Sequence, residues 1–306
     1  MSEVLHDFHD RSYKDLFSHP EMIKDLLTGF VQEDFIEDID FSDFQKVGTT
    51  YILEEYQKRE TDLIIRLNLK GQEAYLYILI ELQSTPDKYI ALRVLEYLLT
   101  FYQDLLKQKK DLPDKLPSVF PIVLYTGKDP FNCAVSLEEL IDKPYKRLMK
   151  YVPRFEYYKI AINEINEGKY GELIGLENIV AACFNLVRAE KKEKTLEAFE
   201  RLVEISKEHR DYLIRAIEMW LRQFFKRKGI EVGEISLSGG RTMIEDVIDQ
   251  IYEEGIVKGK QEGILEGVEK GKLDMVKKLL KKGFSIEELA DIAEVQVEEL
   301  KKALAE

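Results

Sequence analysis

The sequence of 306 residues has only two cysteines, Cys133 and Cys183. Two cysteines are too few for a disulfide framework, and neither has a histidine or cysteine at the spacing of zinc ligands. No apolar run approaches the roughly 18 residues that a membrane-spanning helix needs. The N-terminus carries acids and histidines, whereas a signal peptide begins with basic residues. We therefore expect a cytoplasmic protein without a membrane partner.

Positive charge is also scarce: 45 lysines and arginines stand against 58 aspartates and glutamates, for a net charge of -13. This balance argues against a protein that binds nucleic acid over its whole surface, but it leaves room for one local basic face. Hydrophobic residues make up 45% of the chain, which is too many for a disordered protein. Length and composition together predict a globular protein of about two domains.

Proline is absent after Pro153, whereas 13 of the 17 glycines follow it, so the two halves of the chain differ in local character. In the first half, short apolar or β-branched runs cover residues 62–69 and 75–83. The residues between them, 70–73, are polar and include a glycine, which is typical of a turn. The segment therefore predicts an antiparallel hairpin.

Helical and strand patterns alternate around this hairpin. Apolar residues at helical spacing predict one helix over residues 13–31 and another over 90–105. Residues 119–125 are typical of a buried strand, and 155–162 of a last strand. A helix between strands indicates an α/β layer, so the expected fold class is α/β.

The second half favours helices, with repeated apolar positions and no proline over residues 173–190, 195–208 and 210–227. A glycine-containing loop near residue 240 ends this region. We predict four parts: an α/β domain over 1–165, a helical subdomain over 166–240, a glycine-repeat helical linker over 241–272 and a small helical tail module over 273–306.

Glycines recur at every fourth position of the linker, at Gly255, Gly259, Gly263, Gly267 and Gly271. In a helix they would lie along one stripe, but the charged residues between them exclude a membrane helix pair. One interpretation is close helix–helix contact in a homodimer through the C-terminal helical region. The other is a mobile spacer, because each glycine costs about 1 kcal/mol in a helix relative to alanine.

Three polar residues converge in the predicted hairpin. Asp62 begins one strand, and Glu81 and Gln83 end the other. The two-residue period of a strand puts Glu81 and Gln83 on one face, and the expected register brings Asp62 opposite them. Two carboxylates and an amide offer the oxygen ligands that Mg²⁺ prefers. The alternative is a pair of solvated acids at strand ends, since paired acids are common on surfaces.

Several motifs follow one another in the first half of the chain: His9-Asp10, Tyr13-Lys14, His19-Pro20, Thr61-Asp62, residues 79–88, residues 93–97 and residues 121–128. In their order and spacing the chain resembles the recombination-promoting nuclease, or putative transposase, family over about residues 6–160. That family is assigned to the PD-(D/E)XK nuclease superfamily, whose core is a mixed sheet flanked by helices and whose metal-dependent active site lies on a central hairpin. The resemblance implies a restriction-endonuclease-like domain followed by an all-helical C-terminal region, and hydrolysis of DNA phosphodiester bonds with Mg²⁺ or Mn²⁺.

Carried onto this sequence, the resemblance makes Asp62 and Glu81 the metal-binding acids of the motif. Gln83 stands at the position that lysine holds in the commonest form of the superfamily, and Thr61 stands in place of the proline. Glutamine removes a cation from the site, but its amide can still hold water by hydrogen bonds. The resemblance suggests that glutamine is usual in this branch, so we interpret Asp62, Glu81 and Gln83 as a variant catalytic site.

Two further cations follow the motif strand. Lys88 and Arg93 lie just before or within the next predicted helix, where a cation would face the scissile phosphate. The alternative is an ordinary solvated helix face.

A basic strip comes next to the last predicted strand. Its cations are Lys143, Lys146, Arg147, Lys150, Arg154 and Lys159, mixed with tyrosines and flanked by only two acids, Asp142 and Glu156. Such a strip is suited to follow a phosphate backbone while its tyrosines stack on bases. A charged, partly exposed edge is the alternative interpretation.

The sequence therefore leaves two main hypotheses for function. The first is a metal-dependent DNA endonuclease that uses Asp62, Glu81 and Gln83. The second is a catalytically weak nuclease-fold module that binds DNA or protein, suggested by Gln83 and by the net charge of -13. A third, an interaction scaffold built on the helical second half, ranks below both.

Overall fold

The computed structural model describes residues 12–46, 62–81, 87–108, 115–142, 146–189, 191–227 and 234–237, and in the last part of the chain 249, 252–253, 260, 275–280 and 285–286. The chain divides into two units, residues 1–248 and 249–306. In the second unit, residues 275–280 are helical. The five glycines of the predicted dimer contact lie outside the described residues, so the homodimer stays a prediction.

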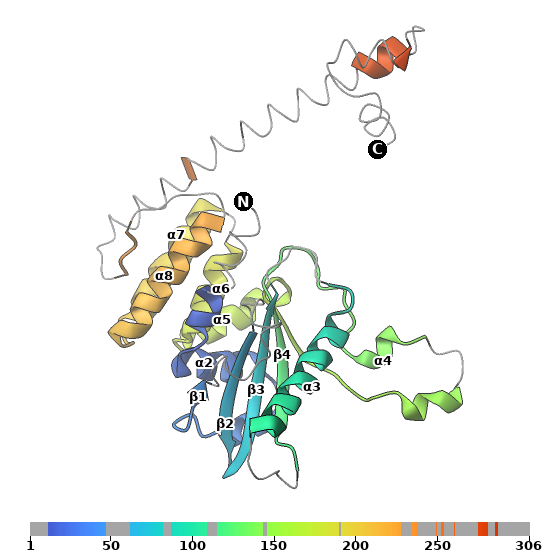
Figure 1. The fold of residues 1–306 in the computed structure, drawn as a ribbon. Helices are drawn as coiled ribbons and strands as arrows, with labels where there is room; N and C mark the ends of the chain where they lie inside the picture. The colour runs from blue at the N-terminus through green and yellow to red at the C-terminus, as the bar shows by residue number, and fades with distance from the viewer. Residues whose placement is uncertain are drawn as a thin grey trace. The chain divides into compact units, whose positions relative to one another are not determined.

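A five-stranded sheet forms the centre of the first unit, with its strands in the order in which they occur along the chain (Figure 1). The strands are β1 (Gln45–Lys46), β2 (Asp62–Leu69), β3 (Gln72–Glu81), β4 (Ser118–Tyr125) and β5 (Tyr158–Ala161). The first three are antiparallel, whereas β3, β4 and β5 are parallel. The predicted α/β class is confirmed, and the sheet is mixed.

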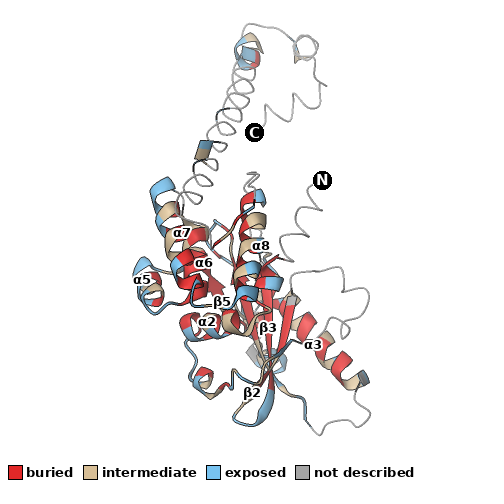
Figure 2. Ribbon diagram, turned by 90° about the vertical axis from the view of Figure 1, so that its left-hand side faces the viewer, coloured by how far each residue is buried: buried red, intermediate tan, exposed pale blue. Residues whose placement is uncertain are grey.

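Helices cover both faces of this sheet, as the burial in Figure 2 shows. Helix α3 (Ile90–Gln108) lies on one face, and α2 (Pro20–Phe30) and the helices after β5 lie on the other. Those later helices are α5 (Glu167–Gly175), α6 (Ile179–Arg188), α7 (Lys192–Ser206) and α8 (Asp211–Arg227), and a short α4 (Leu137–Leu140) follows β4. No described helix has both the length and the apolar composition needed to cross a membrane.

Strand β3 is buried on both faces, so a layer must pack on each side of the sheet. Every residue from 74 to 80 is buried, which is typical of a strand enclosed on both faces. Tyr75, Tyr77 and Leu79 belong to the core cluster that includes the buried side of α3. The apolar residues between them face the other way, because side chains alternate along a strand.

Two predicted helices are broken in the structure. The helix expected over 13–31 divides before Pro20, because the residue preceding a proline is disfavoured in the helical conformation; His19 is accordingly extended. The helix expected over 173–190 divides into α5 and α6 at Glu177, whose φ is 59°. A left-handed residue ends a helix, and Asn178 begins the next one.

Asn178 and Asp25 join α2 to the start of α6. The Asn178 side chain accepts a hydrogen bond from Ala181 N at 2.8 Å and donates one to the backbone oxygen of Asp25 at 2.8 Å. The Asp25 carboxylate in turn accepts from Ile179 N at 2.7 Å. A Cβ on Gly29 would lie 2.8 Å from Asn178 Nδ2, so glycine permits this close approach. Burial raises the pKa of Asp25.

Replacing Asn178 by alanine removes a helix cap and the side-chain hydrogen bond that joins α6 to a backbone oxygen of α2. We expect Asn178→Ala to lower the free energy of unfolding by about 2–3 kcal/mol in urea denaturation. The matched control is Asn166→Ala, which removes the cap of α5 at an exposed position and should cost only about 1 kcal/mol. Equal losses in the two variants would contradict the structural role of Asn178 between the helices.

The buried Asp25 carboxyl should make stability depend on pH. Since desolvation raises its pKa in the folded state, the folded protein holds this proton more tightly than the unfolded chain does. The corresponding stability is present below the ordinary carboxyl pKa of about 4 and is lost as pH rises through the raised pKa. Relative to Asp25→Asn, the wild type should therefore lose free energy of unfolding as the pH rises above about 4. A difference that stays flat or grows with pH would contradict this.

Candidate active site

Asp62 and Glu81 of the predicted motif lie at the same end of the sheet. Asp62 is the first residue of β2, Glu81 is the last of β3 and Tyr125 is the last of β4. Glu81 pairs in register with Tyr125 on the parallel neighbour, and Asp62 pairs with Leu79 on the antiparallel one. The start of β2 therefore lies beside the carboxyl ends of β3 and β4, as in a site built at strand ends.

The register differs by two residues from the one expected. A four-residue turn over 70–73 would have placed Asp62 opposite Glu81, but the turn contains only Lys70 and Gly71. Their φ values are 49° and 86°, which fit the two-residue turn that twisted hairpins favour. Gly71 N donates to the side chain of Asn68 at 2.7 Å, which holds the turn. The prediction that Asp62 faces Glu81 directly is therefore wrong.

The observed register still keeps the two acids on one face of the sheet. Asp62 pairs with Leu79, and strand residues two apart share a face, so Glu81 is the diagonal neighbour of Asp62. Such diagonal neighbours in a sheet lie about 7–8 Å apart. The face is that of α3, because Leu79 and Tyr125 belong to the core cluster beneath that helix. The side chains of Asp62 and Glu81, and all of Gln83, lie outside what the structure describes.

Arg93 is held at the start of α3 by Asp87. The Arg93 Nη1 atom lies 3.3 Å from Asp87 Oδ2, and the Arg93 side chain is 21% exposed. Asp87 also accepts a hydrogen bond from Tyr89 N at 2.9 Å, which fixes the carboxylate at the beginning of the helix. Arg93 is thus a positioned guanidinium and not an ordinary solvated side chain.

Sequence reasoning did not assign a role to Asp87. The available signal was an acid three residues before the first residue of a helix, a common position for a side chain that binds the helix start. Lys88, in contrast, is exposed and makes no ion pair with any residue that the structure describes. Its Nζ atom lies 5.6 Å from the centre of the Tyr89 ring.

The structure describes only some of the side chains of the predicted basic strip. Arg147, Lys150 and Arg154 are exposed, whereas Lys143 and the side chain of Lys146 lie outside the described residues. Lys159 binds Glu164 at 2.6 Å, so this cation is already neutralised. Among the described residues no cluster of three or more His, Cys, Asp or Glu is suited to a metal.

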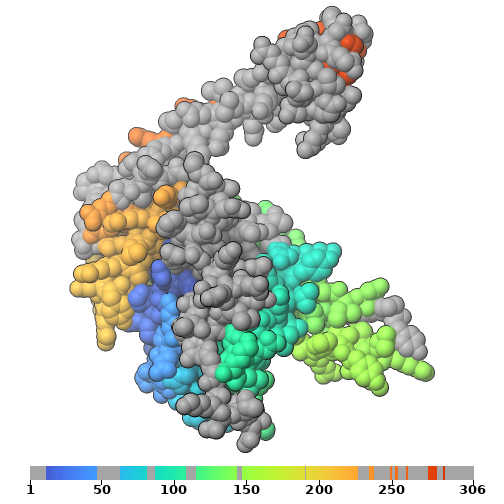
Figure 3. Space-filling view, in the orientation of Figure 1, coloured from blue at the N-terminus to red at the C-terminus, as the bar shows by residue number. Residues whose placement is uncertain are grey.

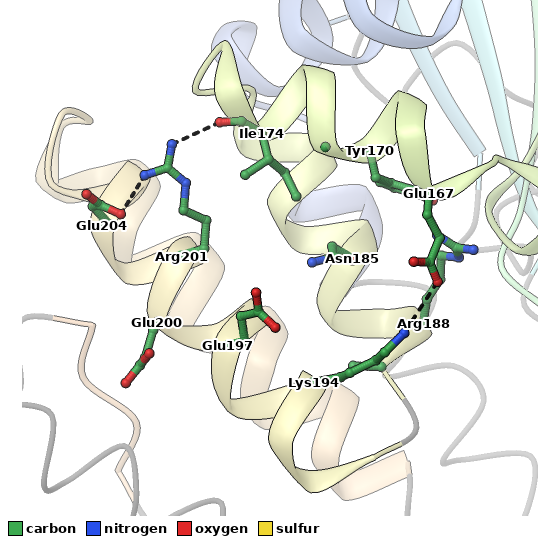
Figure 4. A pocket seen from close by; sticks show the side chains of 12 residues that line it. Glu167, Tyr170, Ile174, Asn185, Arg188, Lys194, Glu197, Glu200, Arg201 and Glu204 are labelled. Carbon is green, nitrogen blue, oxygen red and sulfur yellow. Dashed lines mark hydrogen bonds and ion pairs between the residues drawn. The ribbon is translucent and has the colours of Figure 1, made fainter.

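A cavity of about 610 Å³ lies in the helical layer, between α5, α6 and α7 (Figure 4). Several of the charged side chains that line it form ion pairs. Lys194 Nζ lies 3.5 Å from Glu167 Oε1, and Arg201 Nη1 lies 2.5 Å from Glu204 Oε2. Arg201 also donates to the backbone oxygen of Ile174 at 3.0 Å. The Glu167–Lys194 pair and the bond from Arg201 to Ile174 connect α7 to α5, whereas Arg201 and Glu204 pair within α7; we interpret all three as structural.

Comparison with known proteins places the chain among nuclease relatives. The family model described as "Putative transposase, YhgA-like" matches residues 7–213. Recombination-promoting nuclease RpnC of Escherichia coli K12 is 27% identical over 305 residues, which cover 97% of this chain and 96% of that protein. Recombination-promoting nuclease RpnD of Escherichia coli O157:H7 is 25% identical over a segment that covers 44% of this chain and 52% of that protein.

Not every relative carries the name of an active enzyme. The inactive recombination-promoting nuclease-like protein RpnE of Escherichia coli K12 is 23% identical over 50% of this chain and 51% of its own. No solved structure matches the chain.

A substitution of Gly71 tests the two-residue turn that sets the register of Asp62. The φ of 86° at this glycine is strained for any residue with a Cβ, so Gly71→Ala should lower the free energy of unfolding by about 1–2 kcal/mol in urea denaturation. The matched control is Gly171→Ala, within α5, where a Cβ also meets open space but no positive φ is required. That variant should gain about 0.5–1 kcal/mol. A loss at Gly171 equal to the loss at Gly71 would contradict the assigned turn.

Proposed function

This chain belongs to the YhgA-like putative transposase family, and from that membership we propose that it is a metal-dependent DNA endonuclease of the PD-(D/E)XK type. Relatives named recombination-promoting nucleases support a nuclease with a role linked to recombination. The observation that carries the proposal is the hairpin register, which brings Asp62 and Glu81 to one edge and one face of the sheet.

The donor set of this edge suits a hard divalent cation. Asp62 and Glu81 would hold Mg²⁺ or Mn²⁺, since such ions are often bound by one or two carboxylates together with water and phosphate oxygens. A bound metal lowers the pKa of water and neutralises charge on the phosphate.

The remaining tasks fall to Gln83 and Arg93. The amide of Gln83 can accept a hydrogen bond from a water molecule and donate one to a phosphate oxygen, so it positions both without adding charge. The cation that glutamine does not supply would come from Arg93, which Asp87 holds at the first turn of α3. A guanidinium is well suited to contact phosphate oxygens.

The proposal is tested by DNA cleavage with Asp62→Asn and Glu81→Gln, on supercoiled and linear DNA with Mg²⁺, Mn²⁺ or EDTA. We expect the wild type to cut only with metal, and both variants to lose activity by at least about 100-fold, because a charge essential in the transition state is removed. The matched control is Glu73→Gln, the same change on the same strand at the opposite end of the hairpin, which should retain activity.

Two outcomes would contradict this assignment. Equal cutting by the wild type and both site variants would indicate a contaminating nuclease. Loss of activity in Glu73→Gln as well as in the site variants, with unchanged unfolding curves, would show that the edge formed by Asp62 and Glu81 has no special role.

A second candidate function is a nuclease-fold module that binds DNA and cuts poorly. It is favoured by Gln83 in place of the usual lysine and by the relative that is named inactive. Metal-independent DNA binding without any cleavage by the wild type would support this function. In that case Gln83→Lys, which adds a cation at the same position, is the variant to test for a gain of cleavage.

A further inference from the structure

An arm leaves the sheet between β4 and β5. We define the arm as residues 134–157; it contains α4 and the short helix η3 (Lys146–Tyr151), and it stands off from the sheet in Figure 1. Its two sides are joined near the base by backbone hydrogen bonds, from Leu137 N to Phe155 O at 2.9 Å and from Tyr157 N to Val135 O at 3.2 Å. The base of the arm is therefore an ordered part of the fold.

The base of the arm is also anchored in the core. Tyr157 is 3% exposed, belongs to the α3 core cluster and donates from its hydroxyl to Ala134 O at 2.8 Å. Phe155 packs against the same cluster. On the other side, Ser136 and Glu139 form a capping box at the start of α4. The base of the arm is thus held against the core on both of its sides.

The tip is the basic part of an acidic protein. Residues 143–154 contain five cations and no acid, although acids outnumber cations in the whole chain. Arg147, Lys150 and Arg154 are exposed, and none of them forms an ion pair with a residue that the structure describes. Elsewhere cations such as Arg66 and Lys159 bind nearby carboxylates. The tip therefore offers positive charge that the described part of the protein does not neutralise.

Large apolar side chains are exposed among these cations. Leu148 is 59% exposed and Tyr151 is 72% exposed, the highest value for a large hydrophobic residue in the described part of the chain. Lys150 Nζ lies 4.8 Å from the centre of the Tyr151 ring, so charge and an aromatic face are side by side. Figure 3 shows the arm as a projection of the surface. Cations alone suffice to bind phosphates, whereas an exposed aromatic ring is suited to stack on a nucleic-acid base.

The arm begins at the edge that carries the candidate active site. Strand β4 ends at Tyr125, which is in register with Glu81, and the arm follows nine residues later. DNA held by the arm would therefore be held by a segment that leaves the sheet beside Glu81.

We propose that the tip of the arm binds unpaired bases of DNA, with Tyr151 and Leu148 packed on base faces and Arg147, Lys150 and Arg154 on the phosphates. The identity of the ligand as DNA rests on the proposed nuclease function. Stacking requires accessible base faces, which a single strand offers and an intact duplex hides. The arm would thus direct the enzyme to single-stranded or locally opened DNA.

The test measures binding of the full chain to a fluorescein-labelled 20-nucleotide single strand and to the duplex of the same sequence. Fluorescence anisotropy in EDTA separates binding from cleavage. We expect Tyr151→Ala to weaken single-strand binding by about 5- to 100-fold, as for loss of one stacked base, and to change duplex binding by less than about twofold. Tyr151→Phe keeps the ring and should bind like the wild type. Leu176→Ala, at a 71% exposed position of the helical layer, is the matched control.

The cations are tested by a triple variant, Arg147→Gln, Lys150→Gln and Arg154→Gln. It should weaken binding to both DNA forms and reduce the slope of log affinity against log salt by about one for each lost phosphate contact. Lys207→Gln, an exposed cation at the end of α7 that pairs with no described carboxylate, should leave both affinities and slopes unchanged.

A direct readout comes from Tyr151→Trp. Stacking on a base should quench the new tryptophan when the single strand is added, while the native Trp220, which is 1% exposed, supplies a constant background. Unchanged fluorescence at saturating single strand would overturn the stacking contact.

Two further results would overturn the proposal for the arm, and a third would separate it from the proposed nuclease function. Equal losses of single-strand and duplex binding in Tyr151→Ala would show that the arm does not select unpaired bases. Unchanged DNA binding in both arm variants, together with lost binding to vesicles containing anionic lipid, would assign the arm to a membrane surface. Absence of metal-dependent cleavage with arm-dependent binding intact would reject the proposed nuclease function but leave the arm assignment standing.

Discussion

Burial of β3 on both faces is the constraint on which the rest of this fold depends. A strand whose residues 74–80 are all buried requires a layer on each side, and the chain supplies α3 on one side and α2 with the later helices on the other. The same strand pairs antiparallel with β2 and parallel with β4. Its carboxyl end therefore becomes the place where the start of β2, the end of β4 and the first turn of α3 come together.

Polar contacts join the helices on the face opposite α3 to one another and to the sheet. Asn178 and Asp25 exchange hydrogen bonds between α6 and α2, and Tyr158 of β5 binds the backbone on both sides of Val31 through its hydroxyl. Because buried polar groups are costly when unpaired, these bonds favour one arrangement of the helices over others of similar apolar contact. These contacts hold the helical layer on the face of the sheet opposite α3.

Charge is divided unevenly over the fold. In the helical layer, carboxylates and cations pair within and between helices, as Glu167 does with Lys194. The tip of the arm has cations that no described carboxylate neutralises, next to an exposed tyrosine. An overall charge of -13 would repel DNA from most of the surface, so a localised basic tip would also orient the approach of DNA.

The sequence by itself determined the kinds of elements and their order, because alternation and helical spacing are local properties. It indicated the hairpin, the strand over 119–125, the helix over 90–105 and the family. The roles of Asp62 and Glu81 as site residues stay a prediction from the sequence. Only the tertiary structure decided the register: a turn of two residues instead of four moved Asp62 from Glu81 to Leu79. It also decided that Lys159 is neutralised by Glu164 and that Asp87 holds Arg93. These outcomes depend on backbone φ values and on which side chains packing brings within hydrogen-bond distance, and residue spacing alone does not contain that information.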